Sequence, residues 1–427
     1  MTGSALFFRS LVPKDWRGRP SFDKAADFAV VLAVLSLPWS TTLAAIFLVA
    51  WILLLAPTVD LGQFVELFKL PQCYLPILLF ALAVLGLSWS EASWSVGLYA
   101  VGTVVKLLAL PLLIVTFGRS ERGAWVFVAF LISCVLLEAL SWMSWLNPKS
   151  ILDPTKNAGV PVKNYISQSQ EFVLAMFGCT LASIMAWRAG RRLSAFFLCL
   201  LAISFPVNMF FVISSRTALV SLPILLLILA ARYLNPLRLS ILVFVLLAVS
   251  ATIWVGSSSV HERLESIVSE VARYRSTGEP TSAGQRLEFW KKSIEFVREA
   301  PLLGHGTGSI KELFREDAVG KEMASAVVIA NPHNQTFDFA IQWGIVGVIL
   351  MYAMWISYVR LFWAEGWVPW VGLLVVLQNV SGSIFNSHIS DFVEGWIFVI
   401  GVGTAAGMML ERSSRRETRP NVAESLR

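Results

Sequence analysis

Long apolar runs separated by short polar breaks recur twelve times along the chain. Most runs are about 17–25 residues long, the length that a helix needs to cross a hydrocarbon layer about 30 Å thick. They lack the strict apolar/polar alternation of strands in a membrane barrel. Because backbone groups in lipid must pair internally, we expect each run to be a helix. The predicted spans are residues 25–38, 40–56, 74–90, 97–117, 122–146, 165–187, 193–213, 217–231, 237–256, 333–358, 366–384 and 390–410.

Composition agrees with this pattern. Hydrophobic residues make up 56% of the chain and charged residues 15%, and the mean hydropathy is +0.68. A soluble globular domain has roughly 45–50% apolar and about 25% charged residues. The four cysteines lie in or beside predicted spans, so they do not indicate a disulfide framework. The chain is therefore predicted to be an all-α polytopic membrane protein.

The basic residues fix the predicted orientation. Nineteen Lys/Arg fall in the two tails and the predicted inner loops, and four fall in the short outer loops. Positive residues are enriched on the cytoplasmic side of membrane proteins, so both termini are predicted to be cytoplasmic. The formal charge of +6 reflects this topology and does not indicate nucleic-acid binding. The predicted parts are a cytoplasmic tail (1–24), nine spans (25–256), an outward-facing segment (257–332), three spans (333–410) and a basic cytoplasmic tail (411–427).

The outward-facing segment 257–332 has the pattern of a small helical domain. "VHERLESIVSEVARY" and "RLEFWKKSIEFVRE" each place apolar residues on one helical face, and "PLLGHGTG" ends the second helix. In the second helix the predicted apolar face consists of Leu287, Trp290, Ile294 and Val297. We expect these faces to lie on the membrane surface or across the mouths of the spans.

Four polar residues come to the outer ends of spans or the adjoining loop once this topology is applied: Arg216, Arg286, His333 and Asp391. Each also has a purely structural interpretation. Arg216 can extend to the lipid headgroups, and Arg286 can belong to a solvated helix face. His333 and Asp391 can cap the helices that they precede.

Other polar residues fall within spans. Lys106 and Glu138 lie at similar predicted depths, and because buried charges are costly unless paired, we expect them to form an ion pair. Glu171 is a secondary site candidate near the outer end of its span. His388, Asp391 and Glu394 are spaced three apart, as helical metal ligands can be, but soft ligands are absent. We therefore predict no metal and no cofactor.

Two stretches resemble the bacterial O-antigen ligase/polymerase superfamily. "RLEFWKKSIEFVREAPLLGHGTGS" is followed by "HNQTFDFAIQWGIVG", in which His333, Asn334, Gly344 and Gly347 match the ligases' His-Asn, nine residues, Gly-x-x-Gly pattern. "SSRTA", which contains Arg216, matches the superfamily's Ser-Arg element. His305 within "GHGTG" departs from the small or apolar residue that is commoner there.

The resemblance implies a membrane-embedded, GT-C-like glycosyltransferase that uses a lipid-linked donor. Such ligases transfer a polysaccharide, with inversion, from undecaprenyl pyrophosphate to a sugar of the lipid A core, on the periplasmic face of the bacterial inner membrane. On this interpretation Arg216 and Arg286 bind the pyrophosphate, because guanidinium groups bind phosphate oxygens bidentately. His333 accepts the proton of the acceptor hydroxyl, and Asp391 orients the imidazole or contacts the acceptor. Asn334, His305 and Glu171 are secondary candidates.

Three alternatives to a ligase stay open. An O-antigen polymerase performs the same chemistry with a second lipid-linked glycan as acceptor, and a protein O-oligosaccharyltransferase performs it with a protein. From another class of protein, a secondary transporter also often has twelve spans, but it predicts related halves with interrupted helices near mid-membrane. The expected partners are the lipid-linked donor, the lipid A-core acceptor and membrane lipids, without nucleic acid.

Overall fold

The computed structural model describes residues 20–58, 62, 67–147, 158–213, 216–256 and 258–418. Throughout these residues the regular structure is helical, with no strand. The helices are α2 (Pro20–Ser36), α3 (Thr41–Leu55), α5 (Pro71–Leu85), α6 (Trp94–Val104), α7 (Ala109–Gly118), α8 (Gly123–Leu146), α9 (Tyr165–Arg188), α10 (Arg192–Asn208), α11 (Arg216–Tyr233), α12 (Pro236–Gly256), α13 (Ser258–Thr277), α14 (Ser282–Glu299), α15 (Ile310–Asp317), α16 (Gln335–Phe362), α17 (Trp367–Gly382) and α18 (Phe392–Thr418). Short 3-10 helices are η1 (Ala56–Thr58), η2 (Gly86–Ser88), η3 (Val105–Leu108) and η6 (Met323–Ala326), and η5 (Met209–Ile213) is a short π-helix.

Every predicted span coincides with a helix in this structure. Among the described residues, eight helical segments are long and apolar enough to cross a membrane. Three further predicted spans correspond to shorter apolar stretches in α11, α12 and α17, and the first corresponds to α2. The chain is thus an all-α polytopic membrane protein, and the total of twelve crossings stays a prediction. Helix α2 begins inside the predicted cytoplasmic tail, whose residues 1–19 lie outside the described part, and α18 extends past residue 410.

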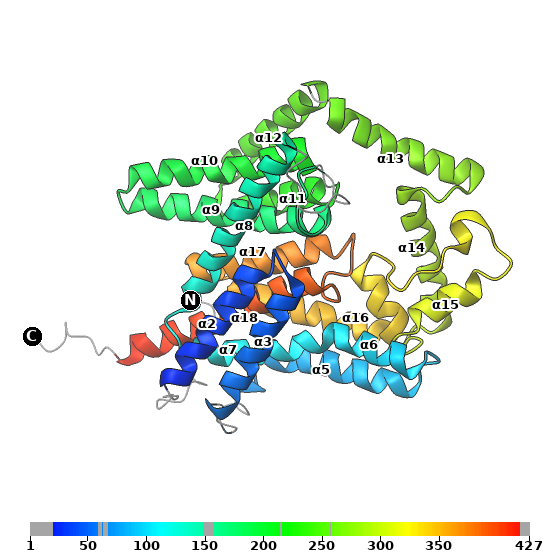
Figure 1. Cartoon of the computed structure of the whole chain (residues 1–427), viewed down its shortest axis with the longest axis horizontal. Helices are drawn as coiled ribbons and strands as arrows, with labels where there is room; N and C mark the ends of the chain where they lie inside the picture. The colour runs from blue at the N-terminus through cyan, green and yellow to red at the C-terminus, as the bar shows by residue number, and fades with distance from the viewer. Residues whose placement is uncertain are drawn as a thin grey trace, which may run out of the picture.

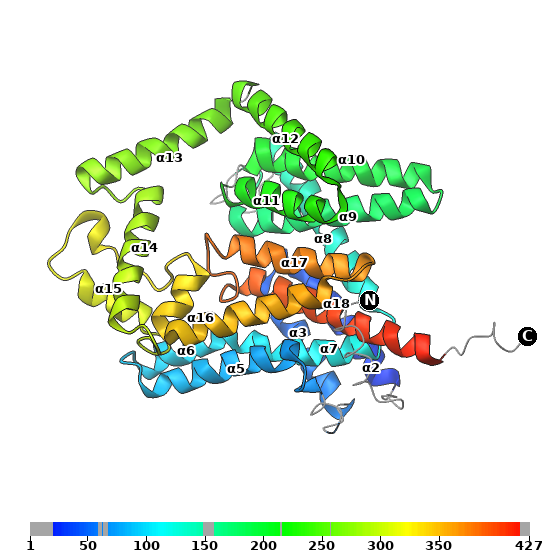
Figure 2. The same cartoon turned by 180° about the vertical axis from the view of Figure 1, so that it is seen from behind.

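Three helices from the C-terminal part of the chain, α16, α17 and α18, run through the middle of the bundle (Figures 1 and 2). Helices α5, α6 and α7 lie on one side of them and α9 to α12 on the other. Helix α18 packs closely against α7. Its Gly407 lies against the α7 backbone, where an added Cβ would be 2.8 Å from the carbonyl oxygen of Ile114. Small residues at such an interface let two spans approach closely.

Segment 258–332 forms a helical unit at one edge of the bundle, around α13, α14 and α15 (Figure 1). Its own apolar cluster consists of Phe289, Phe296, Ile310 and Phe314, joined by Ile341 from α16. The predicted face of α14 is therefore only partly correct. Trp290 and Val297 pack on this cluster, but Leu287 and Ile294 are exposed, because the phenylalanines supply the inward face.

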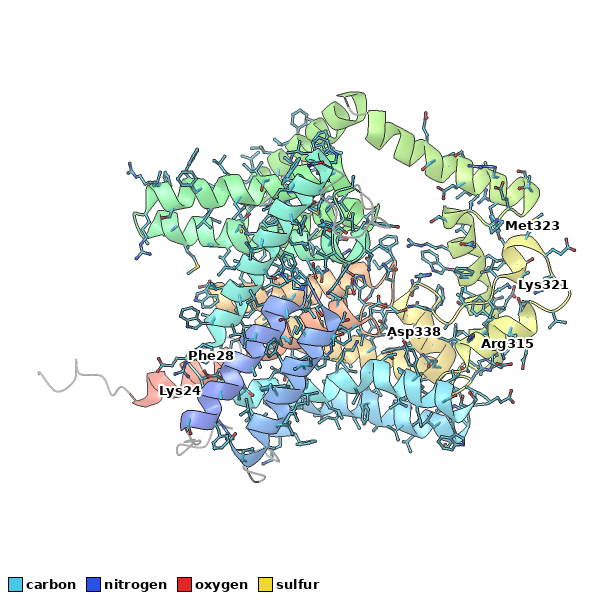
Figure 3. All side chains as sticks on the ribbon, viewed as in Figure 1. Lys24, Phe28, Arg315, Lys321, Met323 and Asp338 are labelled. Atoms are coloured by element: carbon cyan, nitrogen blue, oxygen red, sulfur yellow. The ribbon has the colours of Figure 1, made fainter. Side chains whose placement is uncertain are left out.

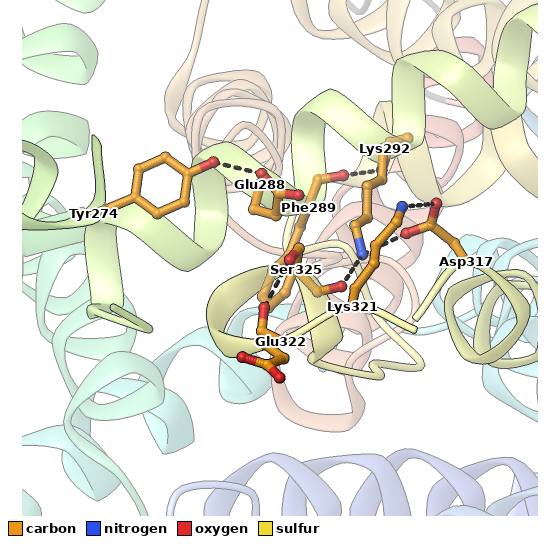
Figure 4. Close-up of polar contacts among 9 residues, drawn as sticks. Tyr274, Glu288, Phe289, Lys292, Asp317, Lys321, Glu322 and Ser325 are labelled. Atoms are coloured by element: carbon orange, nitrogen blue, oxygen red, sulfur yellow. Dashed lines mark hydrogen bonds and ion pairs between the residues drawn. The ribbon is translucent and has the colours of Figure 1, made fainter. Parts of the chain in front are cut away.

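A buried lysine ties this unit together. Lys292 forms an ion pair with Asp317 at 2.5 Å and donates to the carbonyl oxygen of Ser325 at 2.6 Å (Figure 4). Tyr274 of α13 donates a hydrogen bond to Glu288 of α14. These contacts hold α14 against α13 and α15, and α14 in turn packs on α16.

Candidate functional site

Two segments that are far apart in sequence meet at the start of α16: residues 331–338, and the connection between α17 and α18, here called loop 383–391. The Gln335 N–H donates to the carbonyl oxygen of Ser383 at 2.9 Å, and the Gln335 side-chain oxygen accepts from the N–H of Ile389 at 2.7 Å. The Asn334 side chain donates to the carbonyl oxygen of Ile384 at 3.0 Å. These bonds fix loop 383–391 against the first turn of α16.

His333 lies between this loop and α14. Its φ is 55°, a left-handed value that is rare for a residue with a side chain, and its N–H donates to Asn331 Oδ1 at 2.8 Å. Its Nδ1 is 3.3 Å from Asn386 Oδ1, and its ring stacks on Phe289 of α14 with centroids 6.4 Å apart. Since an amide oxygen only accepts, Nδ1 is the nitrogen that carries the proton, and Nε2 keeps its lone pair.

The electrostatic surroundings of His333 favour the neutral imidazole. Burial lowers the pKa of His333 below its usual value, and the nearby cation of Arg286 lowers it further, while the hydrogen bond with Asn386 acts in the opposite direction. A neutral imidazole with a lone pair on Nε2 is the form that accepts a proton. The cation of Arg286 thus favours the neutral state of His333, and the joint role of the two residues in the site stays a prediction.

Asp338 forms a polar hub that the sequence analysis did not identify. Its carboxylate, which is nearly fully buried, accepts from Ser390 Oγ at 2.7 Å, Gln342 Nε2 at 2.8 Å and Gln335 Nε2 at 3.1 Å. Figure 3 labels Asp338 on α16, and Arg315 and Lys321 in the loop unit. Asp338 therefore joins α16 to loop 383–391.

Lys106 holds the end of loop 383–391, and the predicted ion pair with Glu138 is wrong. The 3-10 helix η3 interrupts the span between α6 and α7 around Lys106. Lys106 Nζ donates to the carbonyl oxygens of Ile389 at 3.1 Å, Ser390 at 3.1 Å and Asp391 at 2.5 Å. Glu138 instead accepts a hydrogen bond from Ser204 Oγ at 2.7 Å. Similar predicted depth did not make the two residues neighbours, because Lys106 in η3 faces loop 383–391, whereas Glu138 of α8 faces Ser204 of α10.

Asp391 carries the last of the three carbonyls that Lys106 holds, and it precedes α18. Burial raises the pKa of Asp391, and the neighbouring Glu394 raises it further, with Lys106 acting the other way. Asn386, and not Asp391, is the side chain that contacts the imidazole of His333. The predicted contact of Asp391 with the acceptor stays a prediction.

The N-terminal end of α9 adds further polar groups. Ser167 donates to Glu394 Oε1 at 2.7 Å, and Glu171 is buried close to both Glu394 and Lys163. Lys163 itself donates to the carbonyl oxygen of Leu37. Glu171 therefore belongs to the same polar region as the loop, which agrees with its choice as a secondary candidate but does not test a role in the reaction.

Gly344 marks a break in α16. Its φ of 59° and ψ of −155° are non-helical, and a Cβ there would be 2.3 Å from the carbonyl oxygen of Leu302. The break removes the helical bonds from the N–H groups of residues 345 and 346 to the carbonyls of residues 341 and 342. Four bonds to residues 301–306 replace them: Ile345 to Pro301 (2.9 Å), Val346 to Leu302 (3.5 Å), His305 to Ile341 (2.8 Å) and Gly306 to Gln342 (2.9 Å).

The motif spacing now has a structural explanation. Asn334 caps α16 by accepting from the N–H of Phe337 at 3.1 Å, and nine residues separate it from the break at Gly344. These nine residues form one short helical segment between a cap and a kink. His305 contacts the carbonyl oxygen of Phe296 at 2.8 Å and Asn334 is a cap, so both secondary candidates have structural contacts here.

Of Arg216, the other predicted pyrophosphate ligand, the structure describes the backbone but not the side chain. Arg216 begins α11, but its side chain lies outside the described part of the chain, as do Ser214 and Ser215. The meeting of the two guanidinium groups stays a prediction.

Within the described residues, no group of three or more His, Cys, Asp or Glu side chains is arranged to hold a metal ion. His388 and Glu394 are buried, and Glu394 accepts the Ser167 hydroxyl.

The fold and this site define a class of protein: a polytopic helical membrane protein whose polar side chains gather where one span meets a helical loop unit. Residues 201–352 match the sequence profile of the family described as O-antigen ligase, and this region includes Arg216, Arg286 and His333. Residues 201–352 are thus similar to the O-antigen ligase family, as the motifs indicated. Members of this superfamily are glycosyl-transferring ligases and polymerases, which supports a transferase in general.

A relative from Haemophilus influenzae (strain ATCC 51907 / DSM 11121 / KW20 / Rd), described as an uncharacterized protein, is 24% identical over 143 residues. The alignment covers 32% of this chain and 36% of that protein. The chain therefore spans about a third of the relative that it matches, and the similarity supplies no further activity.

Proposed function

We propose that this protein is an O-antigen ligase. It transfers a polysaccharide from undecaprenyl pyrophosphate to a sugar hydroxyl of the lipid A core, at the periplasmic face of the bacterial inner membrane. The observation that carries the proposal is the position of His333: its imidazole lies between Phe289 of α14 and Asn386 of loop 383–391, and His333 belongs to the residues that match the family.

The chemistry follows from the state of this imidazole. The acceptor hydroxyl gives its proton to His333 Nε2, and its oxygen forms the new bond to the anomeric carbon of the donor. The bond from that carbon to the pyrophosphate oxygen breaks, and the electron pair leaves with the undecaprenyl pyrophosphate. Attack from the face opposite the leaving group inverts the anomeric carbon. The lowered pKa of His333 keeps Nε2 able to accept the proton at neutral pH.

The leaving group gains negative charge as the bond breaks, and Arg286 and Arg216 are proposed to bind it. A guanidinium group stays ionised and offers paired N–H donors to phosphate oxygens. Such donors stabilise developing charge more strongly where water is scarce. Asp391 is proposed to contact the acceptor, because it lies in loop 383–391, which also carries Asn386, the partner of His333.

Reconstitution with lipid-linked glycan tests the proposal, with three acceptors offered in parallel: lipid A-core, a second lipid-linked glycan, and a serine-bearing protein. A ligase transfers to the lipid A-core. Transfer only to the second glycan would instead identify a polymerase, and transfer only to the protein an oligosaccharyltransferase. Solute flux without any glycan transfer would identify a transporter.

Substitutions in the same assay test the residues. Arg216→Ala and Arg286→Ala are each expected to reduce transfer at least a hundredfold, with poor rescue by lysine, because lysine supplies a point charge and not a fork. Arg298→Ala is the matched control, since Arg298 is an exposed arginine in the last turn of the same helix as Arg286. Normal activity in both alanine variants at the two candidate positions would refute the pyrophosphate role.

A further inference from the structure

An apolar cavity of about 630 Å³ opens among α2, α8, α9, α10, α17 and α18. Along α9 its wall runs from Leu174 to Ala189, whereas the polar site uses the opposite end of that helix, around Ser167. Along α17 the wall runs from Trp367 to Val375, in the first part of the helix, while loop 383–391 follows the last part. The end of the cavity at Arg191 therefore lies opposite the candidate active site, and the cavity extends between the helices toward that site as far as Leu37 and Ile397.

One charged side chain lines this cavity among the residues that the structure describes. It is Arg191, an exposed residue in the tight turn between α9 and α10, where Gly190 has a φ of 76°. Arg188 and Arg192 lie in the same turn, and Arg192 stacks on the Trp187 ring at 5.7 Å. The mouth of an apolar cavity is thus next to a concentration of positive charge.

We propose that this cavity binds an anionic phospholipid, with an acyl chain between the helices and the phosphate at Arg191. An opening between membrane spans is reached from the bilayer, so its natural occupant is a lipid chain. Basic pockets between spans bind anionic headgroups, and guanidinium groups bind phosphate bidentately. The volume lies in the range of pockets that enclose a small ligand, about 300–1,000 Å³.

The position of Arg191 argues against the polyprenyl donor as the occupant. Helix α9 has 24 residues, which corresponds to about 35 Å at 1.5 Å per residue. A phosphate held at Arg191 is therefore about a membrane thickness away from the end of α9 that faces loop 383–391. The inference does not rest on the proposed function, because it concerns the other end of the spans and a lipid that does not react.

Photo-crosslinking tests the proposal. The full chain is placed in phosphatidylcholine vesicles that contain a small fraction of phosphatidylglycerol carrying a photoactivatable group on its acyl chain. We expect cross-links to concentrate on peptides from α9, α10 and α17 that line the cavity. The same label carried on phosphatidylcholine should react there several times less.

Two pairs of variants locate the headgroup and the chain. Arg191→Gln should reduce the preference for phosphatidylglycerol about fivefold, the effect of one arginine beside an anionic lipid, and Arg188→Gln, in the same turn but outside the cavity, should not. Ala182→Phe fills the cavity and should remove the cross-links, whereas Ile184→Phe, on the exposed side of α9, should keep them.

Three results would overturn the proposal. The first is an even distribution of label over all lipid-facing helices. The second is an unchanged preference for phosphatidylglycerol in the Arg191→Gln variant. We expect this variant to insert and fold even if the Ala182→Phe variant does not. The third is displacement of the label by polyprenyl phosphate but not by unlabelled phosphatidylglycerol, which would make the cavity a prenyl-chain site.

Discussion

Replacing Lys106 by methionine tests how loop 383–391 is held. The side chain is 4% exposed, and its three hydrogen bonds, at 2.5, 3.1 and 3.1 Å, end on consecutive carbonyls. A hydrogen bond to a charged group contributes about 1.5–3 kcal/mol. The cost of burying the ammonium group, which is several kcal/mol, offsets part of the stabilisation from these three hydrogen bonds. Methionine removes that cost but leaves carbonyls without a donor, so we expect a net loss of about 3 kcal/mol in the free energy of unfolding.

The measurement is unfolding in mixed micelles by titration with a denaturing detergent, followed by a thiol-reactive dye. The buried thiols report unfolding, and a Cys199→Ser background removes the exposed thiol; the reporters are Cys73, Cys134 and Cys179. In the folded state, the Lys106→Met variant should also transfer glycan more slowly, because the released loop carries Asn386, the partner of His333.

A double-mutant cycle with Glu138→Gln distinguishes this explanation from an ion pair. Glu138 contacts Ser204 and not Lys106, so the two changes should be additive within about 0.5 kcal/mol. A coupling energy above about 1 kcal/mol would show that the two charges interact directly. A loss below about 1 kcal/mol for Lys106→Met alone would show that the three carbonyl contacts do not hold the loop.

Two further predictions concern α16 and its base. Gly344→Ala should destabilise the protein by about 3 kcal/mol or more, since it adds backbone strain to the contact with Leu302. The control is Gly102→Ala, where a Cβ meets nothing within 4 Å, and it should be neutral or stabilising. Equal effects of the two substitutions in the same unfolding assay would contradict this prediction. Transfer should fall at acidic pH as His333 becomes protonated, and Arg286→Gln should raise the pKa of His333 toward its usual value, because it removes a repelling cation. Histidine NMR without substrate measures that pKa, and an unchanged or lower value would be evidence against the proximity of the two side chains.

The membrane helices could be predicted from sequence because hydropathy is a local property. Each predicted span coincides with a helix, and the two amphipathic stretches of segment 257–332 became α13 and α14. The inward face of α14 was predicted less well. Leu287 and Ile294 fit a helical stripe as well as Phe289 and Phe296 do, and only the position of α15 and α16 decides which set is covered.

The partners of the site residues could not be predicted in the same way. Lys106 was assigned to Glu138 by counting residues from the span ends, which assumes straight helices and ignores rotation, and the helix breaks at η3 around Lys106. Asn386 lies in the stretch "FNSHISD", whose small polar residues have no periodicity to indicate which one faces His333. The sequence analysis did not identify Asp338, because its partner Ser390 is 52 residues away in loop 383–391.

Most residues of the family motif therefore have structural roles, and only His333 has a candidate chemical role. Asn334 starts the short segment of α16, Gly344 ends it, and residues 301–306 satisfy the backbone groups that the kink exposes. Irregular backbone at the membrane is tolerated only where such partners are supplied. The His333 side chain takes no part in this cap or kink; it contacts Asn386 and Phe289 instead. Its left-handed backbone persists because the cap, the kink and loop 383–391 together determine it, and strain retained in this way is typical of functional positions.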